Sequence, residues 1–215
     1  NGDSVAPGAT PGDTGIILST GNATDFTNSN GQSNQNTGTS TNTSGQNNNT
    51  QFNAAAGANT YDASYIDVDF IPTGDTMTMQ FVFSSEEFPE YSSGSYQDFV
   101  GVWVNGSFVE LSIGDGDIDP ANLSSGSSEN LFIDNTNDAY NTEMDGFSVT
   151  MTLTMTVNSG VVNSIRIGVA DVNDSNYDTN LMIAGDSVQT VLIANDDIAH
   201  LHDPNQVKTI DVLGN

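Results

Sequence analysis

The chain has 215 residues, with 28 acidic residues against two basic ones, no cysteine and a formal net charge of −26. Two basic residues cannot neutralise a nucleic-acid backbone, and an anionic membrane surface is excluded on the same ground unless calcium bridges the two. Without disulfides, the stability of the fold must come from packing and from bound metal. No apolar stretch approaches the roughly 20 residues that span a bilayer.

The first sixty residues are mostly polar. Residues 1–14 form a lead-in rich in Gly, Pro and Asp, which lacks the features of a signal peptide, so we expect the export signal to lie elsewhere in a longer protein. Residues 15–19 are a short apolar run that predicts a strand. Residues 27–60 are almost wholly Asn, Ser, Thr, Gly, Gln and Ala, which predicts a long mobile loop because such a stretch buries little apolar surface.

From residue 64 onward the pattern is that of strands. Apolar residues alternate with polar ones in 65–70, 77–83 and 149–157, and 98–104 is nearly continuously apolar, as expected for a strand covered on both faces. Residues 164–172 and 187–192 complete the set. We find no amphipathic helix of ten residues. The prediction is an all-β fold, an antiparallel β-sandwich of the jelly-roll type with long loops.

The composition changes again near the end of the chain. Residues 194–197 (ANDD) and 210–215 (IDVLGN) resemble the opening of the tandem immunoglobulin- or cadherin-like repeats of large bacterial adhesins. We therefore expect a β-sandwich over residues 1–193 and a linker, or the start of a following repeat, over 194–215.

The distribution of acidic residues predicts calcium. A compact fold with this charge repels itself, and the acids cluster in loops at spacings that suit hard cations. Calcium takes about six to eight oxygen ligands from carboxylate, amide and main-chain carbonyl groups. Millimolar calcium outside cells fills even weak sites, so we expect several calcium ions and an extracellular domain.

The first acidic group runs from Ser84 to Tyr91 and reaches Asp98 across a flexible Ser/Gly loop. Neighbouring side chains on a strand point to opposite faces, so Glu86 and Glu87 are not expected to bind one ion together. One of them, with Asp98, is a candidate calcium ligand. The alternative is a solvated acidic turn.

Two further acidic groups follow. Asp171, Asp174 and Asp178 come after a predicted strand and could curl around one cation. The second group alternates acids with other residues in the manner of a calcium loop, but it lacks the glycine and the bidentate glutamate of an EF-hand, so an ordinary polar turn is equally compatible. It comprises Asp115, Asp117 and Asp119, with Asp145 in a weaker group nearby.

Four ordered motifs resemble the choice-of-anchor L domain family of bacterial surface proteins. These motifs are FVFSSEEFPEY, DFVGVWVNG, EMDGFSVTMT and IGVADVNDSNYDTNLMI, and the early GIILSTGNA fits as well. The resemblance covers about residues 15 to 192, with the Asn/Thr-rich loop as a variable insertion. It implies a cell-surface domain with a β-sandwich fold.

The resemblance extends to the calcium-dependent peptide-binding modules of long RTX-type adhesins, in which a bound calcium helps to capture the terminal carboxylate of a peptide. Carried over by position, it implies a ligand-facing calcium framed by Glu87, Asp98, Asp171, Asp174 and Asp178, with Glu86 as the alternative glutamate. It also implies a groove shaped by Ser92, Ser93, Gly94, Ser95, Tyr96 and Tyr177.

The residues themselves favour the same mechanism, because an anionic ligand normally meets Arg, Lys or a helix N-terminus, and this chain offers almost none of these. We expect an adhesin domain that captures a peptide or protein on a host or neighbouring cell surface, as a monomeric module of a long chain. A calcium-dependent lectin and a structural spacer remain alternatives.

The sequence supports an enzymatic function less well than a binding function. Residues 2–5 and 197–200 only superficially resemble the blocks of GDSL-type esterases, and acidic pairs are too abundant for any one of them to indicate a glycosidase. His200 and His202 could bind zinc, but two histidines in a linker are usually solvated. We therefore expect a binding domain and not an enzyme.

Overall fold

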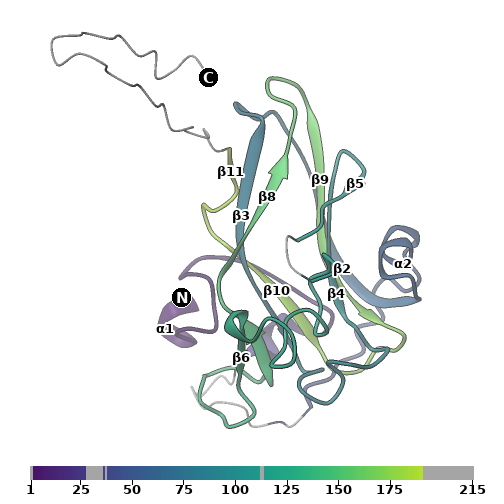
Figure 1. The fold of residues 1–215 in the computed structure, drawn as a ribbon, viewed down its shortest axis with the longest axis vertical. Coiled ribbons are helices and arrows are strands. Elements are labelled where there is room, and N and C mark those ends of the chain that lie inside the picture. The colour runs from purple at the N-terminus through teal and green to yellow at the C-terminus, as the bar shows by residue number, and fades with distance from the viewer. Residues whose placement is uncertain (1, 28–35, 37, 112–113, 191–215) are drawn as a thin grey trace, which may run out of the picture.

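The computed structural model describes residues 2–27, 36, 38–111 and 114–190, and it consists of two antiparallel sheets packed face to face (Figure 1). All strand pairs within the described residues are antiparallel. The prediction of an all-β antiparallel sandwich is therefore confirmed.

The first sheet is organised around one long strand, β3 (Thr76–Ser85). On one side β3 pairs with β10 (Thr179–Ala184) and β11 (Gln189–Thr190), and on the other with β7 (Gly146–Ser148) and β8 (Met151–Thr156). β1 (Gly15–Ser19) extends the sheet beyond β10, and β6 (Phe132–Asp134) extends it beyond β7.

The second sheet has the order β2-β9-β4-β5, with bounds Thr60–Phe70, Asn163–Val172, Phe99–Val104 and Ser107–Phe108. All six residues of β4 are buried, as its continuous apolar character predicts. Trp103 on this strand is buried against Phe52 and Phe108.

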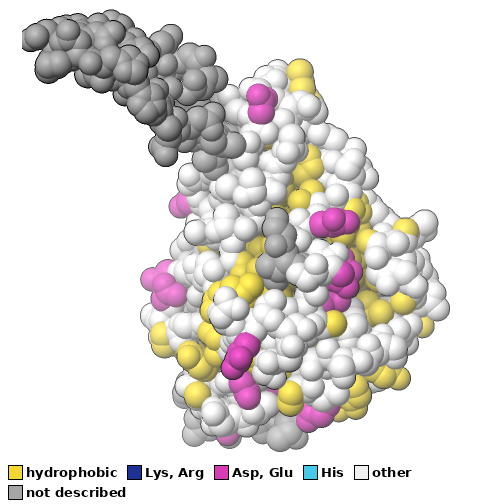
Figure 2. Space-filling model, viewed as in Figure 1, with side chains coloured by type: hydrophobic (Ala, Val, Ile, Leu, Met, Phe, Trp, Pro, Cys, Tyr) yellow, Lys and Arg dark blue, Asp and Glu magenta, His cyan; other side chains and the backbone are white. Residues whose placement is uncertain are grey.

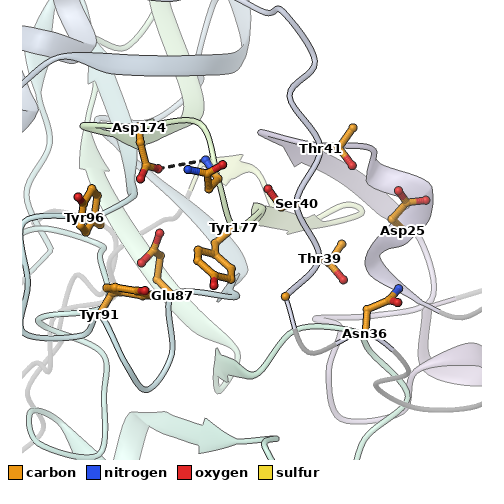
Figure 3. A pocket seen from close by; sticks show the side chains of 12 residues that line it. Asp25, Asn36, Thr39, Ser40, Thr41, Glu87, Tyr91, Tyr96, Asp174 and Tyr177 are labelled. Atoms are coloured by element: carbon orange, nitrogen blue, oxygen red, sulfur yellow. Dashed lines mark hydrogen bonds between the residues drawn. The ribbon is translucent and has the colours of Figure 1, made fainter.

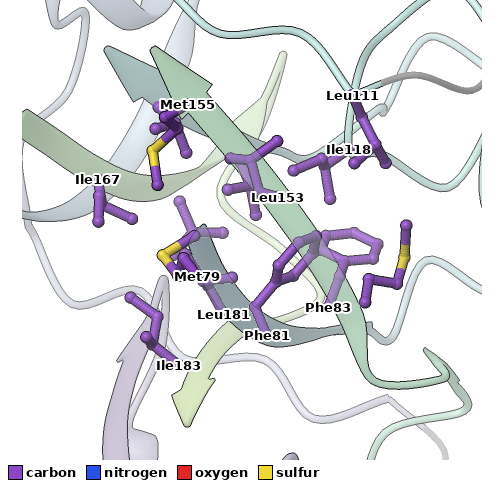
Figure 4. Packing of buried hydrophobic residues seen from close by; sticks show 14 of the residues in the cluster. Met79, Phe81, Phe83, Leu111, Ile118, Leu153, Met155, Ile167, Leu181 and Ile183 are labelled. Carbon is purple, nitrogen blue, oxygen red and sulfur yellow. The ribbon is translucent and has the colours of Figure 1, made fainter. Parts of the chain in front are cut away.

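The main core lies between the two sheets, where β3 contributes Met77, Met79, Phe81 and Phe83 (Figure 4). Strand β8 alternates strictly, with its methionines and leucine buried and its threonines exposed. A second apolar cluster, which includes Phe26, Met144 and Phe147, covers the outer face of the first sheet. Apolar side chains thus lie on both faces of β3, which fixes its position and that of the loop after it.

One sequence prediction is wrong in part. The expected polar loop of residues 27–60 contains the helix α2 (Thr50–Ala56), and β2 begins at its end. The Asn49 side chain accepts hydrogen bonds from the N–H groups of Gln51 and Phe52, and Gly57 ends the helix in the left-handed conformation. Phe52 is fully buried, with its ring centroid 4.9 Å from that of Trp103. A single aromatic side chain anchors a segment whose average composition is that of a loop.

Other differences concern the ends of elements. β10 was not predicted, since its residues follow an acidic motif that was interpreted as a calcium loop. The expected strand 187–192 is observed only as β11, and its last two residues, like the linker 194–215 with His200 and His202, lie outside the described residues. The remaining helices are single turns, α1 (Gly2–Val5), η1 (Ala23–Phe26) and η2 (Glu129–Leu131). None of the described helices is long and apolar enough to cross a bilayer.

Candidate functional site

A polar cavity of about 990 Å³ lies at the end of the sandwich where β3 and β9 end and β4 and β10 begin (Figure 3). Its walls come from the loops after β3 and β9 and from a segment before α2. The lining residues are Asp25, Asn36, Gly38, Thr39, Ser40, Thr41, Glu87, Tyr91, Tyr96, Asp174, Asn176 and Tyr177.

Glu87 is the buried acid of this cavity. Its side chain is only 1% exposed, and Oε2 has no hydrogen-bond partner. Burial, followed by the charge of Asp98, raises the pKa of Glu87 to about 9. Asp174 lies in the same wall, where its Oδ1 accepts a hydrogen bond from the Asn176 N–H at 3.0 Å. A carboxylate buried in this way needs either a proton or a cation.

Three tyrosines stand beside Glu87. The ring of Tyr91 meets that of Tyr96 edge to face at 5.6 Å between centroids, and it meets the ring of Tyr177 at the same separation. Tyr177 has a φ of 60°, an uncommon left-handed conformation for a tyrosine, and its ring lies against Gly38. Figure 3 shows Tyr177 between Glu87 and the opposite wall of the cavity. The tyrosines give an otherwise polar cavity one aromatic wall.

The opposite wall is a segment that we call the strap, residues 38–45. Its main-chain N–H groups bind three buried carboxylates: Thr39 N–H donates to Glu86 Oε1 at 3.0 Å, and Thr41 N–H donates to Asp178 Oδ1 at 2.7 Å. Gly45 N–H donates to Asp62 Oδ1 at 2.8 Å. In all three carboxylates the second oxygen is buried without a partner. Glu86 and Asp178, two metal candidates of the sequence analysis, therefore also hold the strap in place, as does Asp62.

Asp178 is confined by Gly21. A Cβ atom at Gly21 would overlap the Asp178 carboxylate, which lies directly over this glycine. We expect Gly21→Ala to displace the carboxylate, to break its bond to Thr41 and to destabilise the domain by about 1–3 kcal/mol. Urea unfolding at fixed calcium measures the effect. Gly12→Ala is the matched control, because nothing lies within 4 Å of its Cβ position. Equal stability of the two variants would contradict the assigned position of Asp178.

Asp98 and Asp171 form a buried pair behind the cavity. Asp98 Oδ1 accepts from Val172 N–H at 2.8 Å, Oδ2 accepts from the Thr179 hydroxyl at 2.7 Å, and the two carboxyl groups share a hydrogen bond. Asp171 Oδ1 has no partner. Burial raises the pKa of both groups. In Asp98 the hydrogen bonds from Thr179 and Val172 oppose this effect, and in Asp171 the charge of Asp98 adds to it. Neither residue lines the cavity.

A second group of acids lies across three neighbouring strands. Glu86 N–H donates to Asp178 O, and the pairing of Ser85 with Gly146 places Asp145 on the other side of Glu86. Cross-strand neighbours share one face of the sheet, so the three acids form a row, an unfavourable arrangement for like charges. Burial raises the pKa of Glu86 to about 8 and that of Asp178 to about 6.

The adjacent positions on the same face carry more oxygen. Ser84 precedes Glu86 by two residues and pairs with Asn180 across the sheet. Both side chains are buried, and neither Ser84 Oγ nor Asn180 Oδ1 has a hydrogen-bond partner. Hydroxyl, amide and carboxylate oxygens without partners are the donors that calcium uses in proteins.

The loop with Asp115, Asp117 and Asp119 is arranged differently. Asn122 ties it together, since its amide donates to Asp115 Oδ1 and to the carbonyl oxygen of Asp117, and its N–H donates to Asp119 Oδ1. Ile118 within the loop is buried in the main core. Burial raises the pKa of Asp119 to about 6. These bonds are compatible with a polar turn, and calcium at this loop stays a prediction.

The structure thus separates the residues that the resemblance assigned to one ligand-facing ion. Glu87, Asp174, Tyr96 and Tyr177 line the cavity, whereas Asp98 and Asp171 lie behind it and Asp178 and Glu86 hold the strap. In the loop after β3, Ser92, Ser93 and Gly94 do not line this cavity, and Ser95 lines a second, smaller cavity. Sequence reasoning missed Tyr91, Asp62 and the strap. Tyr91 is the last residue of the motif FVFSSEEFPEY, and its place in this motif could have marked it as a site residue.

Basic side chains do not compensate these acids. Arg166 is the only lysine or arginine in the described part of the chain, and it forms a salt bridge of 2.7 Å with Asp67 on the exposed side of β2. Figure 2 shows acidic side chains spread over one face of the molecule. No group of three or more His, Cys, Asp or Glu side chains in the described residues is already gathered as a metal cage. The unpartnered oxygens nevertheless fit calcium, which also takes amide, hydroxyl and main-chain oxygens.

Fold and cavity together define an acidic β-sandwich with a ligand-sized cavity at one end. Residues 5–189 match the choice-of-anchor L domain, and the chain belongs to this family. The membership indicates a domain associated with the cell surface or the extracellular space. It does not extend to the RTX-type peptide-binding modules, whose relationship to this chain stays a prediction.

Two solved structures are similar to parts of the chain. One is a family 35 carbohydrate-binding module from an environmental isolate, with 15% identity and a TM-score of 0.29, covering 82% of this chain and 97% of the module. The other is a β-glucosidase from Kluyveromyces marxianus in complex with glucose, with 12% identity and a TM-score of 0.25, covering 58% of this chain and 11% of the glucosidase. Likeness at this level carries no argument about ligands. No curated protein matches the chain.

Proposed function

We propose that this domain is a calcium-dependent adhesin module that captures a peptide or protein ligand through a carboxylate, and that it is not an enzyme. The observation that carries the proposal is the buried Glu87, which has an unpartnered oxygen in the wall of a polar cavity without a described basic side chain. A cation is the only group that would both neutralise this acid and attract an anionic ligand.

In this proposal Glu87 and Asp174 hold the calcium that faces the cavity. The ion supplies positive charge and an exchangeable coordination position to an incoming carboxylate. Tyr91, Tyr96 and Tyr177 provide the apolar surface beside it, where a ligand side chain would pack. The other buried acids, Glu86, Asp98, Asp171 and Asp178, are assigned to calcium that stabilises the fold.

The same cavity would also suit a sugar, whose paired hydroxyls can bind calcium and whose ring can stack on tyrosine. We favour a peptide because a carboxylate adds charge attraction to the cation, which a neutral sugar lacks. A low or moderate affinity would suffice on a cell surface that carries many copies of the domain. A spacer without a ligand is the remaining alternative.

The test is binding of the domain to an array of peptides with free or amidated C-termini, with glycans alongside, in millimolar calcium and in chelator. We expect capture of free-carboxylate peptides in calcium only. Glu87→Gln should lower this capture at least about tenfold, because it removes one charge from the ion's ligands. Glu129→Gln is the matched control, since Glu129 is exposed at η2 and does not line the cavity.

Each other outcome contradicts part of the proposal. Capture of glycans alone would make the domain a lectin, and capture of amidated peptides in equal amounts would remove the carboxylate from the mechanism. Unchanged binding by Glu87→Gln would place the ligand site elsewhere. If neither peptides nor glycans of the array bind, the structural spacer is the alternative that remains.

A further inference from the structure

Along residues 38–42 of the strap, residues whose main chain is hydrogen-bonded alternate with residues whose main chain is not. Thr39 N–H donates to Glu86, its carbonyl oxygen accepts from the Asp178 N–H at 2.8 Å, and Thr41 N–H donates to Asp178. Alternate residues thus bind toward the sheet, as in an extended strand, in which every second residue directs its N–H and C=O to the same side. Ser40, between them, makes no hydrogen bond with any atom of the described structure.

Ser40 is also exposed and lines the cavity. Figure 3 shows its side chain on the side of the strap that faces Tyr177, with those of Thr39 and Thr41 on the other side. By the same alternation, the N–H and C=O of Ser40 point away from Glu86 and Asp178. Ser40 therefore presents a free main-chain donor and a free main-chain acceptor at the border of the cavity, on a backbone that three buried carboxylates hold in position.

We propose that the free edge at Ser40 pairs with the main chain of an extended peptide ligand, one residue of which donates its N–H to Ser40 O and accepts from Ser40 N–H. This exchange of two bonds is that of a hydrogen-bonded residue pair in an antiparallel ladder, and addition of an extended peptide to a free edge is a recurrent mode of recognition. The inference rests on the proposed function and narrows its ligand to a peptide in an extended conformation.

The pairing adds a requirement that a carboxylate alone does not impose. The ligand must keep one unsubstituted main-chain amide at a fixed distance from its C-terminus, because the calcium and the strap occupy fixed positions in the same cavity. Side chains of the peptide next to the paired residue would meet the three tyrosines or solvent. Recognition would then depend on the peptide backbone at one position and on side chains at others.

The ligand side of the pairing is tested with random hexapeptide pools that carry a free C-terminal carboxylate. In each pool one amide position is N-methylated, and retention on the immobilised domain in millimolar calcium is measured by mass spectrometry. We expect retention to fall roughly tenfold at one position and much less at the others, because N-methylation removes a single donor. Equal retention at all positions would overturn the pairing.

The protein side is tested with Ser40→Pro and Ser40→Ala on the unmethylated pool. Proline removes the N–H of residue 40, whereas alanine keeps it and removes only the hydroxyl. We expect a loss of roughly tenfold for proline and little change for alanine. Melting temperatures of the two variants check that proline leaves the fold intact, and if it does not, the methylated pools decide alone.

The two proposals fail in different ways. If the wild-type domain retains no unmethylated peptide in calcium, the proposed function falls and the pairing falls with it. If the wild-type domain retains peptides, but neither methylation nor Ser40→Pro changes retention, only the pairing at Ser40 is overturned.

Discussion

Removal of calcium at pH 8 should lower the melting temperature of this domain by roughly 5–10 °C for each ion lost. A ligand at a hundred times its dissociation constant stabilises the folded state by about 2.7 kcal/mol, and each kcal/mol corresponds to roughly 2–4 °C in a domain of this size. The physical reason is the set of buried carboxyl groups, led by Glu86 and Glu87, which keep oxygens without partners. Differential scanning calorimetry in millimolar calcium and in chelator measures the shift.

The pH dependence of the calcium-free domain provides the internal control. Burial raises the pKa of Glu86 to about 8 and that of Glu87 to about 9, above the values near 4.5 that these groups have when unfolded. Such groups bind protons more tightly in the folded state, so their contribution to stability is complete below about pH 4 and is lost as the pH rises to about 9. In chelator, the melting temperature should therefore fall from pH 5 to pH 9.

Calcium should flatten this dependence, because the ion replaces the proton as the partner of the buried carboxylates. The largest effect of chelator is then expected at the alkaline end of the range. A melting temperature that does not respond to chelator at pH 8 would remove the assignment of calcium to these acids. The same value measured with magnesium in place of calcium separates a specific site from general screening of charge.

Much of the fold could be predicted because its strands carry local patterns. Strand β8 alternates methionine or leucine with threonine, and each apolar residue is buried while each threonine is exposed. β4 has no alternation because both of its faces are covered. Glu86 and Glu87 follow the last residue of β3 and differ in their surroundings, since Glu86 accepts a hydrogen bond from the strap and Glu87 lines the cavity. Two-residue periodicity therefore predicts β8, and a continuous apolar run predicts β4.

The candidate site could be predicted only in part, because its geometry depends on contacts between distant segments. Thr41 and Asp178 are 137 residues apart in the chain, and no local spacing indicates that one binds the other. Asp98 follows the Ser/Gly loop after β3, but the packing of β4 on β9 buries it beside Asp171 and not in the cavity. The strap could not be predicted from composition, because segments rich in Asn, Ser and Thr are typical of mobile loops. Its order comes from main-chain hydrogen bonds to buried carboxylates that lie far away in the sequence.

Substitution of Asp98 by asparagine should change stability in opposite directions with and without calcium. Asparagine has the same shape and keeps an acceptor for Val172 N–H, while it removes the charge beside Asp171. The charge of Asp98 contributes to the raised pKa of Asp171, and each pK unit of this coupling costs the folded state about 1.4 kcal/mol at a pH above the pKa of the unfolded group. In chelator at pH 8, we expect Asp98→Asn to melt roughly 3–6 °C above the wild type.

In millimolar calcium the order should reverse, because the variant has lost a negative charge that stabilises the bound cation. The quantity that decides is the gain in melting temperature on addition of calcium, which we expect to be at least about halved in Asp98→Asn. Asp69→Asn is the matched control, since Asp69 is exposed on β2 and its loss removes the same charge far from the pair. It should leave the gain unchanged.

The alternative to a cation at this pair is a shared proton, and the two states predict different results. If a proton alone joins Asp98 and Asp171, the asparagine variant should have the higher melting temperature in calcium as well as in chelator, with an unchanged gain. At pH 5 the difference in chelator should shrink in either case, because protonation removes the repulsion in the wild type. Only a gain that falls in Asp98→Asn and not in Asp69→Asn places calcium at the buried pair.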